Sequence, residues 1–370
     1  MPTKKNWALN CDKILEPIFK DLKVIELAGV LAGPSAGLFF AELGAKVIKV
    51  ENPKTGGDVT RTWKLKTEEP EEPGSAYFWS VNACKEFVSL DLSTQKGLEI
   101  LYDLVKTADV VIANYKKGDA EKLKVDYTTL KKLQPKLIYA SITGFGDTVR
   151  SAYDLILQAE SGFMSMNGEP NSNPLKMPVA LIDILAGHHL KEAILLSLLK
   201  LYKQGEGSHV SVSLFDSAVA SLANQATNWL IAGHLPKATG SLHPNIAPYG
   251  ELFETKDKQK ITFAIGSNKQ FKHLCEIIRY KQLAADPRFA LNQGRVSNRA
   301  ELYALLYDYV RQLSFKELYA QCLEFDVPIG KIRDLKEVFE LPEAQAMLRE
   351  ISDGKKKIKV VSGTAIRFEK

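Results

Sequence analysis

The residue whose surroundings most favour chemistry is Asp183. It lies in the run Ala-Leu-Ile-Asp-Ile-Leu-Ala at positions 180–186, so a single carboxylate interrupts an apolar stretch. Burying that carboxylate without a partner would be costly, because the charge would lose its hydration. Two interpretations stay open. Asp183 either caps the N-terminus of a long helix by accepting backbone N–H groups, or it is a desolvated nucleophile held for acyl transfer, and one residue can do both.

Positive side chains form a second group that could do chemistry, by binding phosphate. They lie in or next to connections that should share one side of the molecule: Lys54, Arg61, Lys85, Lys116, Lys117 and Lys122. Charge-assisted hydrogen bonds to phosphate are strong, so a ligand with several phosphates would use such donors. The alternative for each of them is an ordinary solvated surface position, since Lys and Arg are mostly exposed.

The first glycine-bearing turn does not match a dinucleotide-binding fingerprint. Gly29, Gly33 and Gly37 are four residues apart, which is not G-x-G-x-x-G, although Glu51 follows at about the distance of the acid in that fingerprint. The glycines therefore serve either close packing of a helix on a strand or a phosphate or pantetheine contact at a helix N-terminus.

The histidine and cysteine residues give weaker signals of chemistry. His188 and His189 follow Asp183 on the same predicted helix, where packing or a place on the helix face is the simpler interpretation. The cysteines never approach a C-x-x-C spacing and the histidines form no H-E-x-x-H motif, so we predict no metal site.

The elements that must position these residues follow from periodicity. Short β-branched runs alternate with helical patterns, which predicts a mostly parallel sheet covered by helices. We expect strands over 23–27, 46–50, 87–92, 110–114, 137–142 and 209–214, and helices over 34–43, 95–106, 119–133 and 184–202. Ligands bind at the carboxyl ends of strands in such sheets, so the connections 29–34, 51–58, 114–118 and 143–146 should form one rim.

A change in composition predicts a second domain. Pro236, Gly240, Pro244, Pro248 and Gly250 fall within one passage. We therefore expect a large domain over 1–225, a smaller α+β domain over 240–325, and a C-terminal segment over 330–370 that returns to the large domain.

Composition and charge exclude several classes of protein. Of the 370 residues, 45% are hydrophobic and 25% charged, as in ordinary globular proteins. The net charge of +5 is spread along the chain, so no nucleic-acid partner is expected. The longest uncharged stretch near the N-terminus, 27–41, falls short of the roughly 20 apolar residues that cross a bilayer. The first twenty residues carry charges and no apolar signal core, so we expect a cytoplasmic protein with no membrane partner.

Many motifs, in order along the chain, resemble those of the family III CoA-transferases, which include formyl-CoA transferase and the carnitine CoA-transferases. The segments are VIELAGVLAGPSAG (24–37), LGAKVIKVENPKTGGDVTR (43–61), FWSVNACKEFVSLDL (78–92), ADVVIANYKKG (108–118), PKLIYASITGFG (135–146), YDLILQAESGFMSMNGEP (153–170), ALIDILAG (180–187), GSHVSVSLFDS (207–217), HPNIAPYGELF (243–253), DPRF (286–289) and VPIGKI (327–332). They cover nearly the whole chain.

The resemblance implies an activity and a set of site residues. The activity is transfer of coenzyme A from an acyl-CoA thioester to a carboxylic acid through a covalent aspartyl-CoA intermediate, with Asp183 at the position of the family's nucleophile. The implied coenzyme A contacts are Val30, Leu31, Ala32, Lys54, Lys85, Asn114, Tyr115, Lys122 in place of the usual arginine, and Tyr153. The family fold implies a large Rossmann-like domain made from both ends of the chain, a small domain between them, and a homodimer of two interlocked rings.

Departures from the family pattern leave alternatives open. Only DTVRSA separates Gly146 from Tyr153, a shorter loop than the family's, and Glu86 replaces an arginine after the NxxK motif. The α-methylacyl-CoA racemases share the fold but use a histidine base just before the segment that matches Tyr153, where this chain has Ala152. A non-catalytic CoA-binding homologue is the other alternative, and the missing glycine fingerprint opposes an NAD-linked oxidoreductase.

Overall fold

The structure is a computed structural model that describes residues 10–11, 17–352 and 357–369, so most of the charged N-terminal segment lies outside the described residues. Its described residues divide into two compact units. The first comprises residues up to 163, residues 176–234 and residues from 343 onward, and the second comprises residues 164–175 and 235–342.

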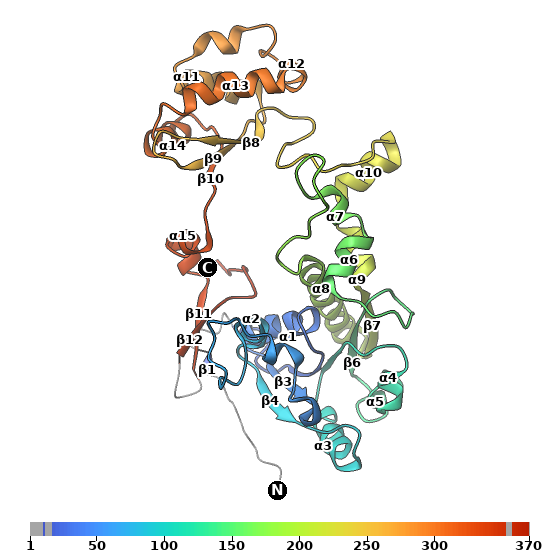
Figure 1. The fold of residues 1–370 in the computed structure, drawn as a ribbon. Helices are drawn as coiled ribbons and strands as arrows, with labels where there is room; N and C mark the ends of the chain where they lie inside the picture. The colour runs from blue at the N-terminus through green and yellow to red at the C-terminus, as the bar shows by residue number, and fades with distance from the viewer. Residues whose placement is uncertain (1–9, 12–16, 353–356, 370) are drawn as a thin grey trace. The chain divides into compact units, whose positions relative to one another are not determined.

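A six-stranded parallel sheet forms the centre of the first unit, in the order β4-β3-β2-β5-β6-β7 (Figure 1). The strands are β2 (Lys23–Leu27), β3 (Lys46–Glu51), β4 (Glu86–Ser89), β5 (Val110–Ala113), β6 (Ile138–Thr143) and β7 (Ser208–Ser213). The predicted α/β class with a parallel sheet is confirmed. The strand order reverses direction between β2 and β5, and Leu27 pairs with Ala113 at the carboxyl end of both strands. Such a switch point is where open α/β sheets bind ligands.

Helices cover both faces of this sheet. Helices α1 (Ala32–Glu42) and α8 (Leu181–Gln204) pack on the face that carries Val24, Val110 and Ile138. Helices α3 (Gln95–Val105) and α5 (Tyr127–Lys131) pack on the opposite face. Successive strand residues point to opposite faces, so each strand contributes alternately to the two cores.

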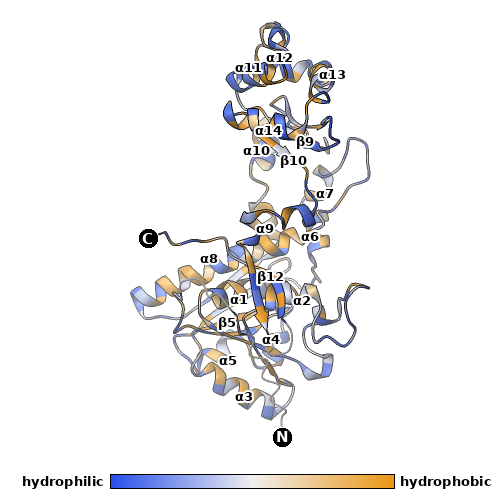
Figure 2. Ribbon diagram, turned by 90° about the vertical axis from the view of Figure 1, so that its left-hand side faces the viewer, coloured by the Kyte–Doolittle hydropathy of each residue, from blue (hydrophilic) through white to orange (hydrophobic). Residues whose placement is uncertain are grey.

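Helix α8 owes its position to a stripe of buried residues spaced three or four apart. The stripe contains Ile182, Asp183, Ala186, Gly187, Leu190, Lys191, Ile194 and Ser197. The helix ends where Gly205 takes a φ of 72°, a left-handed conformation that glycine adopts readily. Figure 2 shows hydrophobic residues recurring along the helix among polar ones. Asp183 therefore belongs to the packed face of the helix.

The single helix predicted over 119–133 is wrong. The segment forms two short helices, α4 (Asp119–Lys122) and α5. Lys124 has a φ of 57°, which cannot continue a right-handed helix, and the Asp126 carboxylate then accepts the backbone N–H of Thr129 to start α5.

The remaining elements of the first unit surround the sheet. They are two 3-10 helices (Pro53–Thr55 and Val59–Thr62), α2 (Ala76–Asn82), α6 (Asp154–Glu160), α9 (Leu214–Ala220), α10 (Ala223–Ala232), and the small sheet of β1 (Asn10–Cys11), β11 (Leu348–Ser352) and β12 (Lys357–Val361). Two short helices, α7 (Phe163–Met166) and α16 (Pro342–Gln345), span the division between the units.

The second unit has its own core around an antiparallel sheet of β8 (Tyr249–Glu254), β9 (Lys260–Ala264) and β10 (Ile329–Lys331). Its helices are α11 (Asn268–Ile277), a 3-10 helix (Lys281–Ala285), α12 (Asn292–Ser297), α13 (Arg299–Val310), α14 (Phe315–Glu324) and α15 (Leu335–Val338). The expected smaller α+β part is thus present.

Within the described part of the chain, no helix is both long and apolar enough to span a membrane. Nor do these residues contain a group of three or more His, Cys, Asp or Glu side chains placed to hold a metal ion.

Candidate active site

A cleft of about 530 Å³ opens at the carboxyl ends of β2, β5 and β6 in the first unit. It lies at the switch point between β2 and β5, as expected for an open α/β sheet. Its lining includes residues 29–32 after β2, residues 113–118 after β5, much of the segment 141–153 and, from α8, Asp183. Three of the four predicted connections thus border one cleft, which Asp183 faces, whereas residues of 51–58 line a second cleft.

Asp183 is buried at this cleft and does not cap its helix. It is the third residue of α8, only 7% exposed, while Ala180 occupies the cap position. Among the described residues, no group donates a hydrogen bond to its carboxylate. Burial, followed by the negative charge of Asp154, raises the pKa of Asp183 to about 7. The N-cap interpretation of Asp183 is therefore wrong, and the carboxylate remains available for chemistry.

Asp154 supplies the capping oxygen instead. This first residue of α6 accepts the backbone N–H of Ile182 at 2.7 Å through one carboxylate oxygen and the amide of Gln158 at 2.6 Å through the other. A carboxylate from another helix thereby satisfies one of the unpaired N–H groups at the start of α8. Sequence reasoning singled out Tyr153 and not Asp154, and it missed this role.

Tyr77, on α2, was also missed. Burial, and then the negative charges of Asp183, Asp154 and Asp58, raise the pKa of Tyr77 to about 12. The phenol therefore lies within electrostatic reach of Asp183 and keeps its proton at neutral pH. Its position 106 residues before Asp183 in the sequence gave no signal of this proximity.

Asn114 holds the turn after β2 against the end of β5. Its side-chain oxygen accepts the backbone N–H of Gly29 at 3.1 Å, and its amide donates to the carbonyl of Gly29 at 2.9 Å. Both residues line the cleft. The contact joins the two connections that flank the switch point.

Gly187 brings α8 close to the start of α1. A Cβ at this position would lie 2.1 Å from the Ser35 hydroxyl oxygen and 3.0 Å from the carbonyl oxygen of Ala32. A larger residue would force the Ser35 hydroxyl to turn away and the Ala32 carbonyl to shift. Because Gly187 lies one helical turn after Asp183, the contact sets the first turn of α8 beside the first turn of α1.

Most of the predicted coenzyme A contacts meet at this cleft. Val30, Leu31, Ala32, Asn114, Tyr115 and Tyr153 line it together with Asp183. Tyr115 is largely buried, which raises the pKa of its phenol to about 12, whereas Tyr153 is largely exposed.

Lys54 lies at a second cleft of about 380 Å³, which shares Gly29 and Tyr115 with the first. Its ammonium group is exposed and pairs with the Asp91 carboxylate at 2.9 Å. The structure thus places Lys54 apart from Asp183, in a second cleft that adjoins the main cleft at two shared residues.

Two of the predicted contacts do not reach either cleft. Lys85 is buried. Its ammonium group donates to both carboxylate oxygens of Glu26, to the carbonyl of Pro34 and to the side-chain oxygen of Asn82, so its hydrogen bonds are made within the protein. Lys122 is exposed on α4 and pairs with Asp119 at 3.1 Å. Neither side chain lines the clefts, so the structure does not support direct coenzyme A contacts for them in this arrangement.

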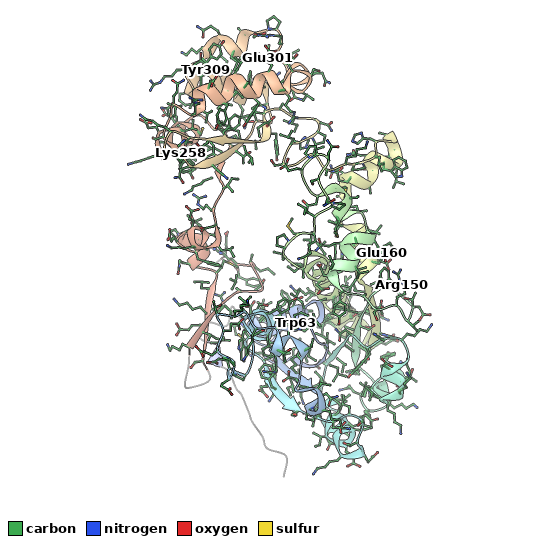
Figure 3. All side chains as sticks on the ribbon, viewed as in Figure 1. Trp63, Arg150, Glu160, Lys258, Glu301 and Tyr309 are labelled. Carbon is green, nitrogen blue, oxygen red and sulfur yellow. The ribbon has the colours of Figure 1, made fainter. Side chains whose placement is uncertain are left out.

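Other cations do line the main cleft. Lys116 and Lys117 follow β5, and Arg150 belongs to the short loop 147–152. The loop is tied down at several points, because Lys117 pairs with Asp147 at 2.8 Å, Lys116 donates to the Ser151 hydroxyl at 2.9 Å, and Arg150 pairs with Glu160 (Figure 3). The shortened loop therefore still borders the cleft and brings a guanidinium group to it.

Comparisons with known proteins agree with this geometry. A family model described as CoA-transferase family III matches residues 19–370. The chain is 42% identical over 338 residues to the succinate–glutarate CoA-transferase of Agrobacterium fabrum, an alignment that covers 90% of this chain and 84% of the relative. It is 34% identical to the human succinyl-CoA:glutarate CoA-transferase over 94% of this chain and 80% of the relative. Among solved structures, a CAIB/BAIF family protein from Brucella suis superposes with a TM-score of 0.81 at 40% identity, covering 94% of this chain and 91% of that one.

Proposed function

The chain belongs to CoA-transferase family III, and we propose that it moves coenzyme A from an acyl-CoA thioester to a carboxylic acid through a covalent intermediate on Asp183. One observation carries this proposal. A carboxylate that is buried, free of hydrogen-bond donors among the described residues, and raised in pKa to about 7 faces the main cleft at the switch point of the sheet. Such a group keeps its nucleophilicity because neither water nor a fixed donor stabilises its charge.

In the first half of the reaction, an oxygen of Asp183 attacks the thioester carbonyl of the donor. The carbon–sulfur bond breaks, the electron pair leaves with the coenzyme A thiolate, and a mixed anhydride forms between the donor acid and Asp183. The thiolate then attacks the aspartyl carbonyl and expels the donor acid as a carboxylate. The protein now carries coenzyme A as an aspartyl thioester, which conserves the free energy of the original thioester.

In the second half, the acceptor carboxylate attacks the aspartyl thioester and releases the thiolate, which gives a second anhydride. Attack of that thiolate on the acyl carbonyl of the acceptor yields the new acyl-CoA and regenerates the Asp183 carboxylate. No proton is gained or lost over the cycle. Water must be excluded while the anhydrides exist, and the burial of Asp183 serves that need.

Each attack places negative charge on a carbonyl oxygen, which requires hydrogen-bond donors nearby. The start of α1 is the best-placed source. The first N–H groups of a helix have no partner within it, and the Gly187 contact sets this end of α1 beside the first turn of α8. We assign the backbone N–H groups of Leu31 and Ala32, which line the cleft, to this role.

The two clefts together offer an extended site for coenzyme A. Its thioester end would lie in the main cleft near Asp183, and its length would carry the other end past Gly29 and Tyr115 toward Lys54. Phosphates along this path would meet the positive charges of Lys116 and Arg150 in the main cleft and of Lys54 in the second.

We propose short dicarboxylic acids as the substrate class. The relatives reported above are named for succinate, succinyl-CoA and glutarate. A dicarboxylate presents a second negative group once its first carboxylate reacts, and besides the cations assigned to the phosphates the main cleft contains Lys117, which could receive it.

The interlocked homodimer implied by the family resemblance is also part of the proposal. Large apolar side chains stay exposed in the single chain, including Leu196 and Tyr202 on α8 and Leu230 and Ile231 on α10. A partner subunit would bury such surface. The expected cytoplasmic location stays a prediction.

An exchange experiment tests this function. The protein is incubated with succinyl-CoA and a panel of carboxylic acids, and new acyl-CoA is measured by chromatography. We expect transfer to dicarboxylic acids, loss of transfer in Asp183→Asn, and normal transfer in Asp216→Asn, which changes an exposed carboxylate in the first turn of α9 that borders neither cleft. Binding of coenzyme A without any transfer would indicate a non-catalytic homologue. Deuterium incorporation beside the thioester without transfer would indicate a racemase.

A further inference from the structure

A network of buried charges lies directly beneath the turn that borders the cleft. Glu26 of β2, Lys49 of β3 and Lys85 are at most 1% exposed, and Asp58 is nearly as buried. Lys49 donates to Glu26 at 2.9 Å and to the carbonyl oxygen of Ala28 at 2.7 Å, and it pairs with Asp58 at 3.0 Å. Buried charges persist only when they are paired, so this network has a defined geometry.

Asp58 is the member of the network that touches the turn. One carboxylate oxygen, Oδ2, faces the Lys49 ammonium group and accepts the backbone N–H of Val30 at 3.1 Å. The other, Oδ1, accepts the backbone N–H of Thr60 at 3.0 Å and the Thr60 hydroxyl at 2.8 Å. The N–H of Val30 also lies 3.4 Å from Oδ1, so its bond to Asp58 is shared unequally between the two oxygens. Oδ1 mainly closes the start of a 3-10 helix, and Oδ2 alone links the lysine to the turn.

Val30 needs such a link. Its φ is 71°, in the left-handed region where a β-branched side chain is strained. A strained residue stays in place only when its surroundings hold it there. The neighbouring residue is held by Asn114, which bonds both the N–H and the carbonyl of Gly29, but that contact does not fix Val30 itself.

We propose that Asp58 is a positioning residue for the reaction: held by Lys49, it locks Val30 in the left-handed conformation and so fixes the start of α1, with the Leu31 and Ala32 N–H groups, beside Asp183. The inference rests on the function proposed above. It assigns a role in turnover to a buried ion pair whose residues border the second cleft and do not contact the reacting atoms.

Asp58→Asn separates this role from the others that Asp58 has. An asparagine keeps the size of the side chain and one acceptor oxygen, which can serve Thr60. Its amide then points two hydrogens at Lys49 and at the N–H of Val30. The shorter bond to the turn is therefore lost, and only the 3.4 Å approach of the Val30 N–H to Oδ1 remains. Lys49 keeps Glu26 and the carbonyl of Ala28 as partners.

The test compares three proteins. They are the single variant Asp58→Asn, the double variant Asp58→Asn with Val30→Gly, and the double variant Asp58→Asn with Val30→Ala. Glycine adopts a positive φ without strain, whereas alanine keeps the penalty that any Cβ carries there, although it lacks the β-branch of valine. We measure kcat for transfer from succinyl-CoA to glutarate and Kd for free coenzyme A by calorimetry, with folding checked by circular dichroism. The control is Glu42→Gln, a buried carboxylate at the other end of α1 that bonds Ser362 and Gly363.

We expect Asp58→Asn to lower kcat about 10- to 100-fold while Kd stays nearly unchanged, as for a misplaced catalytic group. Adding Val30→Gly should restore most of the lost kcat, and adding Val30→Ala should not. Glu42→Gln should keep kcat. Equal kcat in Asp58→Asn and wild type, or equal effects of glycine and alanine, would overturn the inference.

Two further outcomes are also decisive. If Asp58→Asn alone does not fold, the Val30→Gly double variant takes its place: a folded and active double variant supports the inference, and a folded, inactive one that binds coenzyme A overturns it. Failure of both to fold makes Asp58 a residue of the core and overturns it as well. If wild type shows no transfer at all, the proposed function is wrong. If wild type transfers coenzyme A but the variants do not behave as expected, only the role of Asp58 is wrong.

Discussion

Asp154 and Asp183 are joined through the first turn of α8. The carboxylate of Asp154 accepts the N–H of Ile182, the residue just before Asp183, and its charge adds to burial in raising the pKa of the Asp183 carboxyl group. One acidic side chain thereby fixes the position of the other and increases its affinity for a proton. Because Asp154 caps the start of α8, Asp183 can be held in an apolar site without using its carboxylate as the cap.

The activity should depend on pH through Asp183. In the proposed mechanism only the carboxylate form attacks the thioester. Burial and Asp154 raise the pKa of this group to about 7, so kcat/KM for the donor should fall about tenfold per pH unit below pH 7 and level off above it. Asp154→Asn removes a negative charge but keeps an acceptor for the Ile182 N–H. The pKa of Asp183 should drop and the acid limb should move to lower pH. An unmoved limb in Asp154→Asn, measured with Asp216→Asn as control, would contradict the coupling.

The free energy of unfolding should also depend on pH because of Asp183. The pKa of Asp183 is raised from 3.8 to about 7, so the unfolded chain loses this proton before the folded one does. Below about pH 4 the residue has no effect, and between pH 4 and 7 the free energy of unfolding falls as pH rises. Asp183→Asn does not titrate, so above pH 7 it should be more stable than wild type by up to roughly 4 kcal/mol. Urea denaturation at pH 4 and pH 8 measures the free energy of unfolding of both proteins. If the difference between Asp183→Asn and wild type does not grow from pH 4 to pH 8, Asp183 is not a buried carboxylate with a raised pKa.

The close packing of α8 on α1 should be essential for turnover. In Gly187→Ala, the new methyl group would collide with the Ser35 hydroxyl and crowd the carbonyl of Ala32, which pushes the first turns of the two helices apart. We expect kcat to fall about 10- to 100-fold, because small displacements of reacting groups are costly. Gly330→Ala is the control, since a Cβ there meets nothing within 4 Å. Equal kcat in both variants would show that the helix contact does not set the geometry.

The second cleft should contribute to affinity for coenzyme A more than to chemistry. Lys54→Ala removes a positive charge from that cleft, so Kd for coenzyme A should rise and its dependence on salt should weaken, while kcat at saturation stays close to wild type. Lys106→Ala is the matched control, because Lys106 also forms an exposed pair with an aspartate but lies outside both clefts. Titration calorimetry at two salt concentrations compares the two variants. If Lys54→Ala and Lys106→Ala have the same Kd for coenzyme A, coenzyme A does not bind in the second cleft.

Periodicity was sufficient to predict the sheet, because its central strands are largely buried on both faces, and Val110–Ala113 is a continuous apolar run. Strands such as Lys23–Leu27 and Val110–Ala113 accordingly begin and end within a residue of their predicted bounds. The helix over 119–133 was wrong because the break depends on one backbone angle at Lys124, which no pattern of apolar residues encodes.

The site was predictable only where a residue stood out from its own segment. Asp183 did so because it interrupts an apolar run. Tyr77 and Asp154 did not, since their importance arises from contacts made across the fold with α8. Lys85 shows the opposite failure: a lysine in a motif invites a phosphate contact, but its burial against Glu26 becomes visible only when β2 and the segment before β4 are brought together.

Trapping the covalent intermediate tests the central claim most directly. Hydroxylamine attacks an aspartyl thioester and leaves an aspartyl hydroxamate on the protein, so the protein is incubated with succinyl-CoA and hydroxylamine, digested and examined by mass spectrometry. We expect a hydroxamate on the peptide that carries Asp183, only when the acyl-CoA is present and never in Asp183→Asn. Transfer that proceeds at full rate with no modification at Asp183, or with modification at another acidic residue, would contradict the proposed mechanism.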